Sequence, residues 1–217
     1  MSVAVVTGAN KGIGFGIVRA LCQRFSGEVL LTSRDESRGL EAVEKLKREG
    51  LTPRYHQLDI CDEVSIARLR DHLLDQYQGL DVLVNNAGVA FKYGSSESVE
   101  RRARVTLATN YWSSKRVCEM MFPVLRPGAN VVNVSSSCGF LGHLTAKYNT
   151  DNKPRADSQL GKAEKLKEAL ASEDLLIKDL DQLMMEYESS TEDGSYLDKG
   201  WPESTYMVSK VDDLLHI

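Results

Sequence analysis

The sequence of 217 residues has few cysteines, and none of them is spaced like a metal ligand. Its four cysteines, Cys22, Cys61, Cys118 and Cys138, are scattered, without a CxxC pair and without a histidine at ligand spacing. This pattern argues against a zinc site or a disulfide framework and favours reduced cysteines. Cys138 lies two residues from Ser136, so an accessible thiol is an alternative interpretation there. We expect no metal site.

An excess of charge of one sign is also missing. The chain has 27 Lys and Arg against 31 Asp and Glu, a formal net charge of -4, and both signs are spread along it. Such a balance gives no reason to expect nucleic acid or an anionic membrane as a partner. No apolar run approaches the length of a membrane span, and the first residues begin a strand rather than a charged leader. We expect a cytoplasmic protein.

The sequence does contain a regular alternation of two patterns. Short apolar runs at residues 3–6, 28–32, 55–58, 81–84 and 130–134 predict buried strands, and the segments between them have apolar residues at helical spacing. Strands that alternate with helices predict a parallel sheet covered on both faces, and right-handed crossovers make it doubly wound. The predicted fold class is therefore α/β of the Rossmann type. In such sheets ligands bind beyond the carboxyl ends of the strands.

The pattern changes after Ser137. Residues 139–154 look like a loop, residues 156–188 predict one or two charged surface helices, and residues 189–200 are polar and turn-prone. This stretch has too few apolar residues to bury a core of its own. We therefore expect one domain over residues 1–217 with a helical insert at about 139–200.

A glycine-rich segment at residues 7–14 (Thr-Gly-Ala-Asn-Lys-Gly-Ile-Gly) follows the first strand and opens a helix. Glycines there permit a tight turn and a close approach of the backbone to a pyrophosphate. The start of the helix supplies free N–H groups and the positive end of a dipole. In this context the segment predicts a site for a dinucleotide cofactor.

The second strand ends at Arg34. Proteins that bind NAD usually have an acid near this position for the ribose 2′-hydroxyl, whereas an arginine suits a 2′-phosphate. Lys11 adds a second positive charge. We therefore expect NADP(H) rather than NAD(H). In the alternative interpretation Arg34 is a solvated residue and Asp35 starts the next helix.

Four residue types suited to carbonyl chemistry occur late in the sequence, at Asn110, Ser136, Tyr206 and Lys210. Tyr206 and Lys210 are four apart and would share one face of a helix. An ammonium beside a phenol favours the phenolate, which makes the tyrosine a usable proton donor near neutral pH. Ser136 could hydrogen-bond a substrate carbonyl and stabilise charge on its oxygen. Asn110 could hold a water that connects Lys210 to solvent.

These motifs together resemble the short-chain dehydrogenase/reductase family, and in particular its carbonyl reductases. The resemblance rests on residues 10–14, 56–60, 79–88, 90–92 and 200–202, including a complete Asn-Asn-Ala-Gly at 85–88. It implies hydride transfer from NADPH to a ketone, aldehyde or quinone, with a tyrosine as the general acid. It also implies a monomer, because the added helical segment covers the surface that other members use to dimerise.

The glycine loop and the resemblance together assign the site residues. The expected cofactor-binding residues are Gly8, Asn10, Lys11, Gly12, Ile13, Gly14, Arg34, Asp59, Ile60, Asn86, Ala87, Gly88, Tyr206 and Lys210. The expected substrate-binding residues are Phe91, Ser136, Trp201 and Tyr206. Phe91 and Trp201 have an equal alternative as core aromatics.

The resemblance stops after about residue 210. The helix that carries Tyr206 and Lys210 should run on through several turns, followed by further strands and helices. We therefore expect a chain truncated at its C-terminal end, whose last strands are missing. Three hypotheses follow: an active NADPH-dependent carbonyl reductase, a truncated relative that only binds NADP(H), and a Rossmann-type scaffold. The last is disfavoured because all four catalytic residue types are present.

Overall fold

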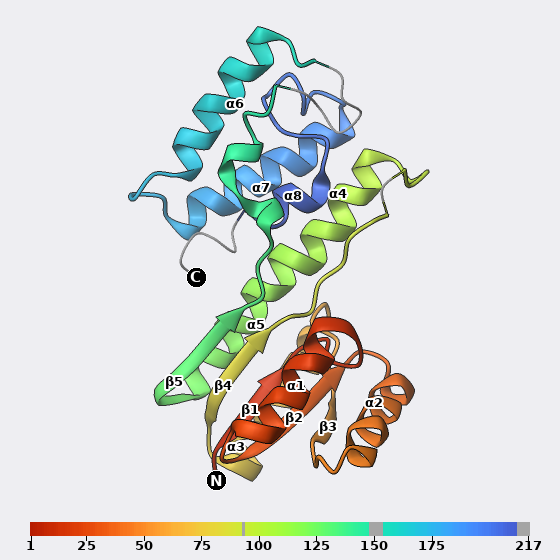
Figure 1. The fold of residues 1–217 in the computed structure, drawn as a ribbon. Coiled ribbons are helices and arrows are strands. Elements are labelled where there is room, and N and C mark those ends of the chain that lie inside the picture. The colour runs from red at the N-terminus through yellow and green to blue at the C-terminus, as the bar shows by residue number, and fades with distance from the viewer. Residues whose placement is uncertain (93, 148–153, 212–217) are drawn as a thin grey trace. The chain divides into compact units, whose positions relative to one another are not determined.

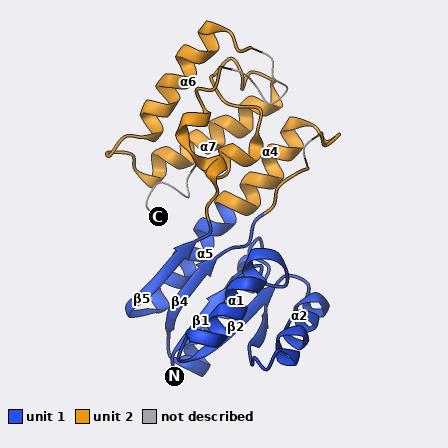
Figure 2. Cartoon of the chain, in the orientation of Figure 1, with its two compact units in different colours: residues 1–88, 112–134 blue, residues 89–111, 135–217 orange. Residues whose placement is uncertain are grey.

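The structure, a computed structural model, describes residues 1–92, 94–147 and 154–211. The chain divides into two compact units (Figure 2). Unit 1 comprises residues 1–88 and 112–134, and unit 2 comprises residues 89–111 and 135–217. The single domain over 1–217 stays a prediction. No helix among the described residues is long and apolar enough to cross a membrane.

Unit 1 contains a five-stranded parallel sheet in the order β3-β2-β1-β4-β5 (Figure 1). Its strands are β1 (Val3–Val6), β2 (Glu28–Ser33), β3 (Arg54–Gln57), β4 (Leu80–Asn85) and β5 (Leu125–Asn133). The predicted α/β fold is therefore confirmed.

The start of β5 differs from the prediction, which placed it at residue 130. Leu80 pairs with Leu125, whereas Val82 pairs with Asn130, so the register shifts between these two positions. Residues 126–129 are thus accommodated as an irregularity inside the strand. They include Pro127 and Gly128, which do not carry a strand pattern.

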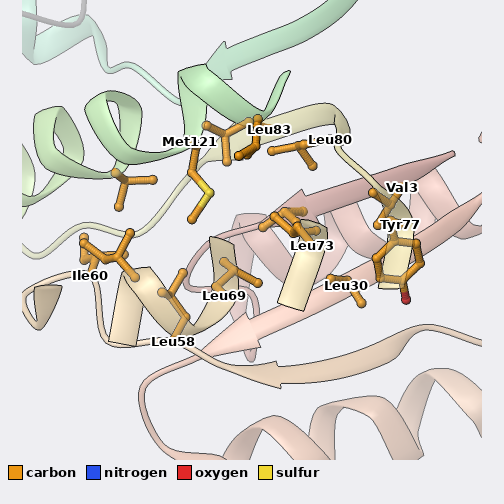
Figure 3. Close-up of a cluster of buried hydrophobic side chains, with 14 residues drawn as sticks. Val3, Leu30, Leu58, Ile60, Leu69, Leu73, Tyr77, Leu80, Leu83 and Met121 are labelled. Atoms are coloured by element: carbon orange, nitrogen blue, oxygen red, sulfur yellow. The ribbon is translucent and has the colours of Figure 1, made fainter. Parts of the chain in front are cut away.

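Helices cover both faces of the sheet in unit 1. Side chains of α1 (Gly12–Arg24) and α2 (Glu36–Arg48) pack with Val6, Val29 and Leu31 on one face. Side chains of α3 (Glu63–Tyr77) and α5 (Ser114–Met121), with the 3₁₀ turn η2 (Phe122–Val124), pack with Val3, Val5 and Leu30 on the other (Figure 3). Because successive strand residues point to opposite faces, β1, β2 and β4 contribute to both cores.

Unit 2 is built mainly from helices. They are α4 (Val99–Leu107), the π-helical turn η1 (Ala108–Ser113), which crosses the boundary between the units, α6 (Asp157–Leu170), α7 (Ile177–Glu192) and α8 (Thr205–Val208), with 3₁₀ turns η3 (Ser137–Gly139) and η4 (Leu141–His143). The helices α7 and α8 pack on α4. The insert therefore buries its apolar residues together with an element from outside it. Residues 148–153 of the predicted loop lie outside the described residues.

The helix that carries Tyr206 is shorter than the sequence predicts. α8 ends at Val208, and Lys210 lies in the turn that follows. The amides of Lys210 and Val211 donate to Met207 and Val208, three residues back, which tightens the end of the helix. Tyr206 and Lys210 are therefore not paired along one regular helix face. The predicted continuation falls largely on residues 212–217, outside the described residues.

Candidate active site

The glycine loop of unit 1 packs directly on the turn after β4. Gly8 and Gly12 have φ of 62° and 60°, a left-handed conformation that glycine adopts without strain. A Cβ atom on Gly8 would lie 2.8 Å from Ala87 Cα, and one on Gly14 would lie 2.4 Å from Asn86 Nδ2. The close approach requires glycine at positions 8 and 14.

Thr7 and Asn86 fasten these two segments together. Thr7 Oγ1 accepts hydrogen bonds from the amides of Asn86 at 3.0 Å and Ala87 at 2.9 Å. The Asn86 side chain donates to the carbonyls of Thr7 at 2.8 Å and Gly8 at 3.2 Å. The ends of β1 and β4 thus form one rigid surface, which holds the predicted cofactor residues Gly8, Asn86, Ala87 and Gly88.

The start of α1 fits the phosphate groups of a dinucleotide. Lys11 is its N-cap residue and makes no side-chain cap hydrogen bond, and the first turn contains no acidic residue. By contrast, Asp35, Asp62 and Ser98 cap α2, α3 and α4 with side-chain oxygens. The N–H groups that begin α1 are therefore free of a side-chain cap, and anions bind such helix starts. Gly12 and Ile13 are exposed and half-buried Asn10 precedes them.

Arg34 is exposed on unit 1 and directly follows β2. Its carbonyl accepts a hydrogen bond from Gln57 Nε2 at 3.2 Å. Among the described residues its guanidinium has no ion pair, whereas that of Arg38 lies 3.6 Å from Asp35. After β3, Asp59 Oδ1 accepts from the amide of Cys61 at 3.0 Å, which fixes the turn that holds Ile60. The arginine is thus available to an anionic ligand.

The four predicted catalytic residues all lie in unit 2. Asn110, on the π-helical turn η1, is 1% exposed and donates from Nδ2 to Ser209 Oγ and to the Val89 carbonyl, each at 2.9 Å. Its Oδ1 accepts from the Val89 amide at 2.8 Å. Ser209 Oγ in turn donates to the Tyr206 carbonyl at 2.8 Å. Asn110 therefore anchors the segment that carries Tyr206 and Lys210, and π-helical turns often occur at functional sites.

Ser136 begins the short turn η3, and the last residue of that turn, Gly139, packs tightly against the backbone of Lys210. Ser136 Oγ accepts from the Cys138 amide at 3.2 Å and so begins η3. At the end of η3, a Cβ atom on Gly139 would lie 2.1 Å from the Lys210 carbonyl oxygen, so only glycine fits. Lys210 itself is 8% exposed. Ser136 also lines an open depression with Phe140 and His143.

Tyr206 lines a separate cavity of about 400 Å³ in unit 2. The predicted substrate residue Phe91 lines it too, with Arg102, Tyr196 and Glu203. Trp201 does not: it is 1% exposed, and its ring centroid lies 5.0 Å from that of Tyr187. The structure thus places Trp201 in the core of unit 2, which was its alternative interpretation. Sequence reasoning missed Arg102, because it lies in a run of charged residues typical of a solvated helix face.

A parallel α/β sheet with a glycine turn between its first strand and helix, together with the Asn, Ser, Tyr and Lys of unit 2, defines a class of dinucleotide-dependent oxidoreductases. Residues 2–149 match the family model described as short chain dehydrogenase. The chain belongs to this family.

Named relatives narrow the comparison. The chain is 44% identical to carbonyl reductase (NADPH) 1 and 46% identical to carbonyl reductase (NADPH) 3, both of Mus musculus, over 209 residues. That alignment covers 96% of this chain and 70% of each relative. Among solved structures, it is similar to menthone neomenthol reductase from Mentha piperita, with a TM-score of 0.80 and 32% identity, over 98% of this chain and 82% of that one.

Proposed function

We propose that this protein reduces ketones, aldehydes or quinones to alcohols or hydroquinones with NADPH. The observation that carries the proposal is the fixed arrangement around Tyr206 in unit 2. Buried Asn110 bonds to Ser209, Ser209 bonds to the Tyr206 carbonyl, and Tyr206 lines a cavity of about 400 Å³. The family membership and the names of the carbonyl reductase relatives support the same reaction.

The residues of unit 1 suit the binding of the cofactor. When bound, NADPH would supply a hydride for the carbonyl carbon of the substrate, and the oxidised cofactor would be released as NADP⁺. The start of α1 would receive the pyrophosphate, since its N–H groups lack a side-chain cap. Arg34 and Lys11, both exposed, would bind the 2′-phosphate by charge-assisted hydrogen bonds. NADPH should therefore be oxidised in preference to NADH.

The residues of unit 2 suit the proton transfer. Tyr206 would donate its phenolic proton to the alkoxide oxygen and complete the alcohol. By the family resemblance, Ser136 would hydrogen-bond the same oxygen in the substrate complex, although it lines a different depression from Tyr206, and Lys210, in the turn after α8, would bring its positive charge toward the phenol. Asn110 would position this segment and the water that links Lys210 to solvent. Phe91 would form part of the wall around the substrate.

We also propose a cytoplasmic monomer. The support is the insert, which forms α6 and α7 in unit 2 and by the family resemblance covers the surface used for dimerisation. Light scattering of the purified chain would test the oligomeric state directly.

The central experiment is NADPH oxidation by the 217-residue chain with a simple quinone, beside a no-enzyme control. Tyr206→Phe should lower turnover by about 10²- to 10⁴-fold, the usual contribution of a positioned general acid, and leave NADPH affinity unchanged. Tyr187→Phe is the matched control, because its buried hydroxyl has no hydrogen-bond partner among the described residues. It should keep wild-type turnover.

Two outcomes would contradict this proposal. Undiminished turnover in Tyr206→Phe would remove the tyrosine from the mechanism. A folded wild-type chain that binds NADPH but reduces no quinone, aldehyde or ketone would leave cofactor binding without the reaction.

A further inference from the structure

The helix α4 carries three arginines, and they differ in their partners. Arg101 Nε lies 2.9 Å from Glu97, and Arg104 lies 2.9 Å from Glu100 and 3.2 Å from Glu192. Arg102 stands between them and, among the described residues, has no ion pair. Its Nε is buried and has no hydrogen-bond partner. A buried donor atom without a partner is costly, so Nε of Arg102 marks a place where a ligand can supply the missing acceptor.

Arg102 lines the same cavity as Tyr206. It lies near two further tyrosines: burial raises the pKa of Tyr187 and of Tyr196, and the positive charge of Arg102 lowers both. Neither hydroxyl forms an ion pair with it at neutral pH, because both phenols are then protonated. The guanidinium thus lies near Tyr187 and Tyr196, and among the described residues it forms no ion pair.

The other charged groups that line the cavity do not balance the charge of Arg102. Among the described residues the charged lining side chains are Lys92, Arg102 and Glu203, which sum to a formal charge of plus one. Glu203 also acts on a cation outside the cavity: burial lowers the pKa of Arg155 and the charge of Glu203 opposes that effect. Lys92 is exposed on the segment before α4, whereas Arg102 is half-buried on a helix. Arg102 is therefore the pre-organised cation.

We propose that Arg102 selects carbonyl substrates that carry a carboxylate, which its guanidinium binds while the carbonyl group faces Tyr206. A guanidinium matches a carboxylate with two parallel hydrogen bonds, and half-buried Arg102 is partly shielded from the water that would weaken them. The cavity of about 400 Å³ is of the size that small-molecule sites have. This inference rests on the proposed carbonyl reduction and adds the substrate class.

The test compares two substrates that differ only in charge, 4-carboxybenzaldehyde and its methyl ester. In Arg102→Gln, the ratio of kcat/KM for the acid to kcat/KM for the ester should fall about tenfold or more, the usual effect of losing a hydrogen-bonded charge. The acid-to-ester ratio of Arg102→Lys should lie between those of wild type and Arg102→Gln, because lysine keeps the positive charge and loses the paired N–H groups of the guanidinium. Arg101→Gln, an exposed neighbour on α4, should keep the wild-type ratio. The acid-to-ester ratio does not depend on the fraction of folded protein, because both kcat/KM values are proportional to that fraction.

A second readout does not need turnover. Line broadening of 4-carboxybenzyl alcohol in NMR spectra should be seen with wild type and Arg101→Gln and be lost with Arg102→Gln. If the wild type reduces neither aldehyde, the proposed function fails, and this binding result alone decides the role of Arg102. An unchanged acid-to-ester ratio or unchanged broadening in Arg102→Gln would overturn the inference. A fall of the acid-to-ester ratio or a loss of line broadening in Lys92→Gln, with neither change in Arg102→Gln, would also overturn it.

Discussion

Gly14 and Gly16 lie two residues apart on α1 and should respond in opposite ways to the same substitution. A Cβ atom on Gly14 would lie 2.4 Å from Asn86 Nδ2 and 2.9 Å from Ala9 Cα, whereas one on Gly16 would meet nothing within 4 Å. Gly14→Ala should lower the free energy of unfolding by about 1–3 kcal/mol through overpacking. Gly16→Ala should raise it by about 0.5–1 kcal/mol, the difference in helix propensity.

The Gly14 substitution should also weaken NADPH binding. The displaced Asn86 amide is the group that donates to the carbonyls of Thr7 and Gly8. Urea denaturation and fluorescence titration with NADPH of both variants would measure the two effects. Equal stabilities of the two alanine variants would show that the loop relaxes around position 14, and the proposed requirement for glycine would then be wrong.

Single residues differ in how well the sequence alone identifies them. The glycine loop could be predicted because the three glycines meet backbone constraints that no other residue satisfies. Trp201 could not be assigned, since a tryptophan suits both a core and a substrate pocket until its 1% exposure is known. The special position of Arg102 depends on which carboxylates its neighbours Arg101 and Arg104 engage, and those include Glu192, distant in sequence.

At the scale of elements, Asn110 couples η1 to the turn after α8. Asn110→Ala should lower the free energy of unfolding by about 2–4 kcal/mol, because it removes two hydrogen bonds to the Val89 backbone and the buried one that Ser209 Oγ accepts. Ser209→Ala alone should cost about 1 kcal/mol. The double variant should cost less than the sum, with a coupling of about 1 kcal/mol.

Denaturant titrations of the four proteins would measure this cycle. Ser190→Ala is a suitable control partner for Asn110→Ala, since the Ser190 hydroxyl bonds within α7 to the Tyr187 carbonyl. That pair should be additive within about 0.5 kcal/mol. Additivity of Asn110 with Ser209 as well would mean that Asn110 does not anchor the Tyr206 segment.

The elements show where periodicity is informative. Short apolar runs predicted a strand at each position of the sheet in unit 1, most clearly at β1, β2 and β4, where burial on both faces leaves a nearly continuous apolar run. They failed at the start of β5, where the register shift with β4 follows from pairing rather than from the strand's own residues. They also failed at α8, whose early end is set by local three-residue hydrogen bonds after Ser209.

At the scale of the whole molecule, the two units differ in how their cores arise. Unit 1 has two apolar clusters that local sequence patterns reveal. Residues 139–200 have few apolar residues, and their helix α7 packs on α4, which lies outside that stretch. That contact brings together segments about 80 residues apart in the sequence, and α4 itself carries three arginines and one glutamate. Long-range packing of this kind cannot be read from local patterns.

The alkaline stability of the folded chain should depend on Tyr77. Its hydroxyl donates to Glu28 Oε2 at 2.6 Å, and the same oxygen lies 2.8 Å from Arg54 Nε. Burial, with the hydrogen bond and charge of Glu28, raises the pKa of Tyr77 to about 12 from 10.0. The folded state thus holds this proton more tightly than the unfolded state. The resulting stability is fully present below about pH 10 and is lost as the pH rises to about 12.

Tyr77→Phe removes this stabilisation and the hydrogen bond that lowers the pKa of Glu28. The unfolding free energy of wild type relative to Tyr77→Phe should therefore fall by up to about 2–3 kcal/mol as the pH rises from 8 to 12. The lowered pKa of Glu28 adds a term that is present above its unfolded pKa of 4.5 and is lost as the pH falls through its folded value. The difference between the two proteins should therefore also shrink in acid.

Urea denaturation of both proteins from pH 4 to 11.5 would measure this difference. The other titrating groups are common to both proteins. A difference that does not depend on pH would therefore show that the Tyr77–Glu28 pair contributes no proton linkage.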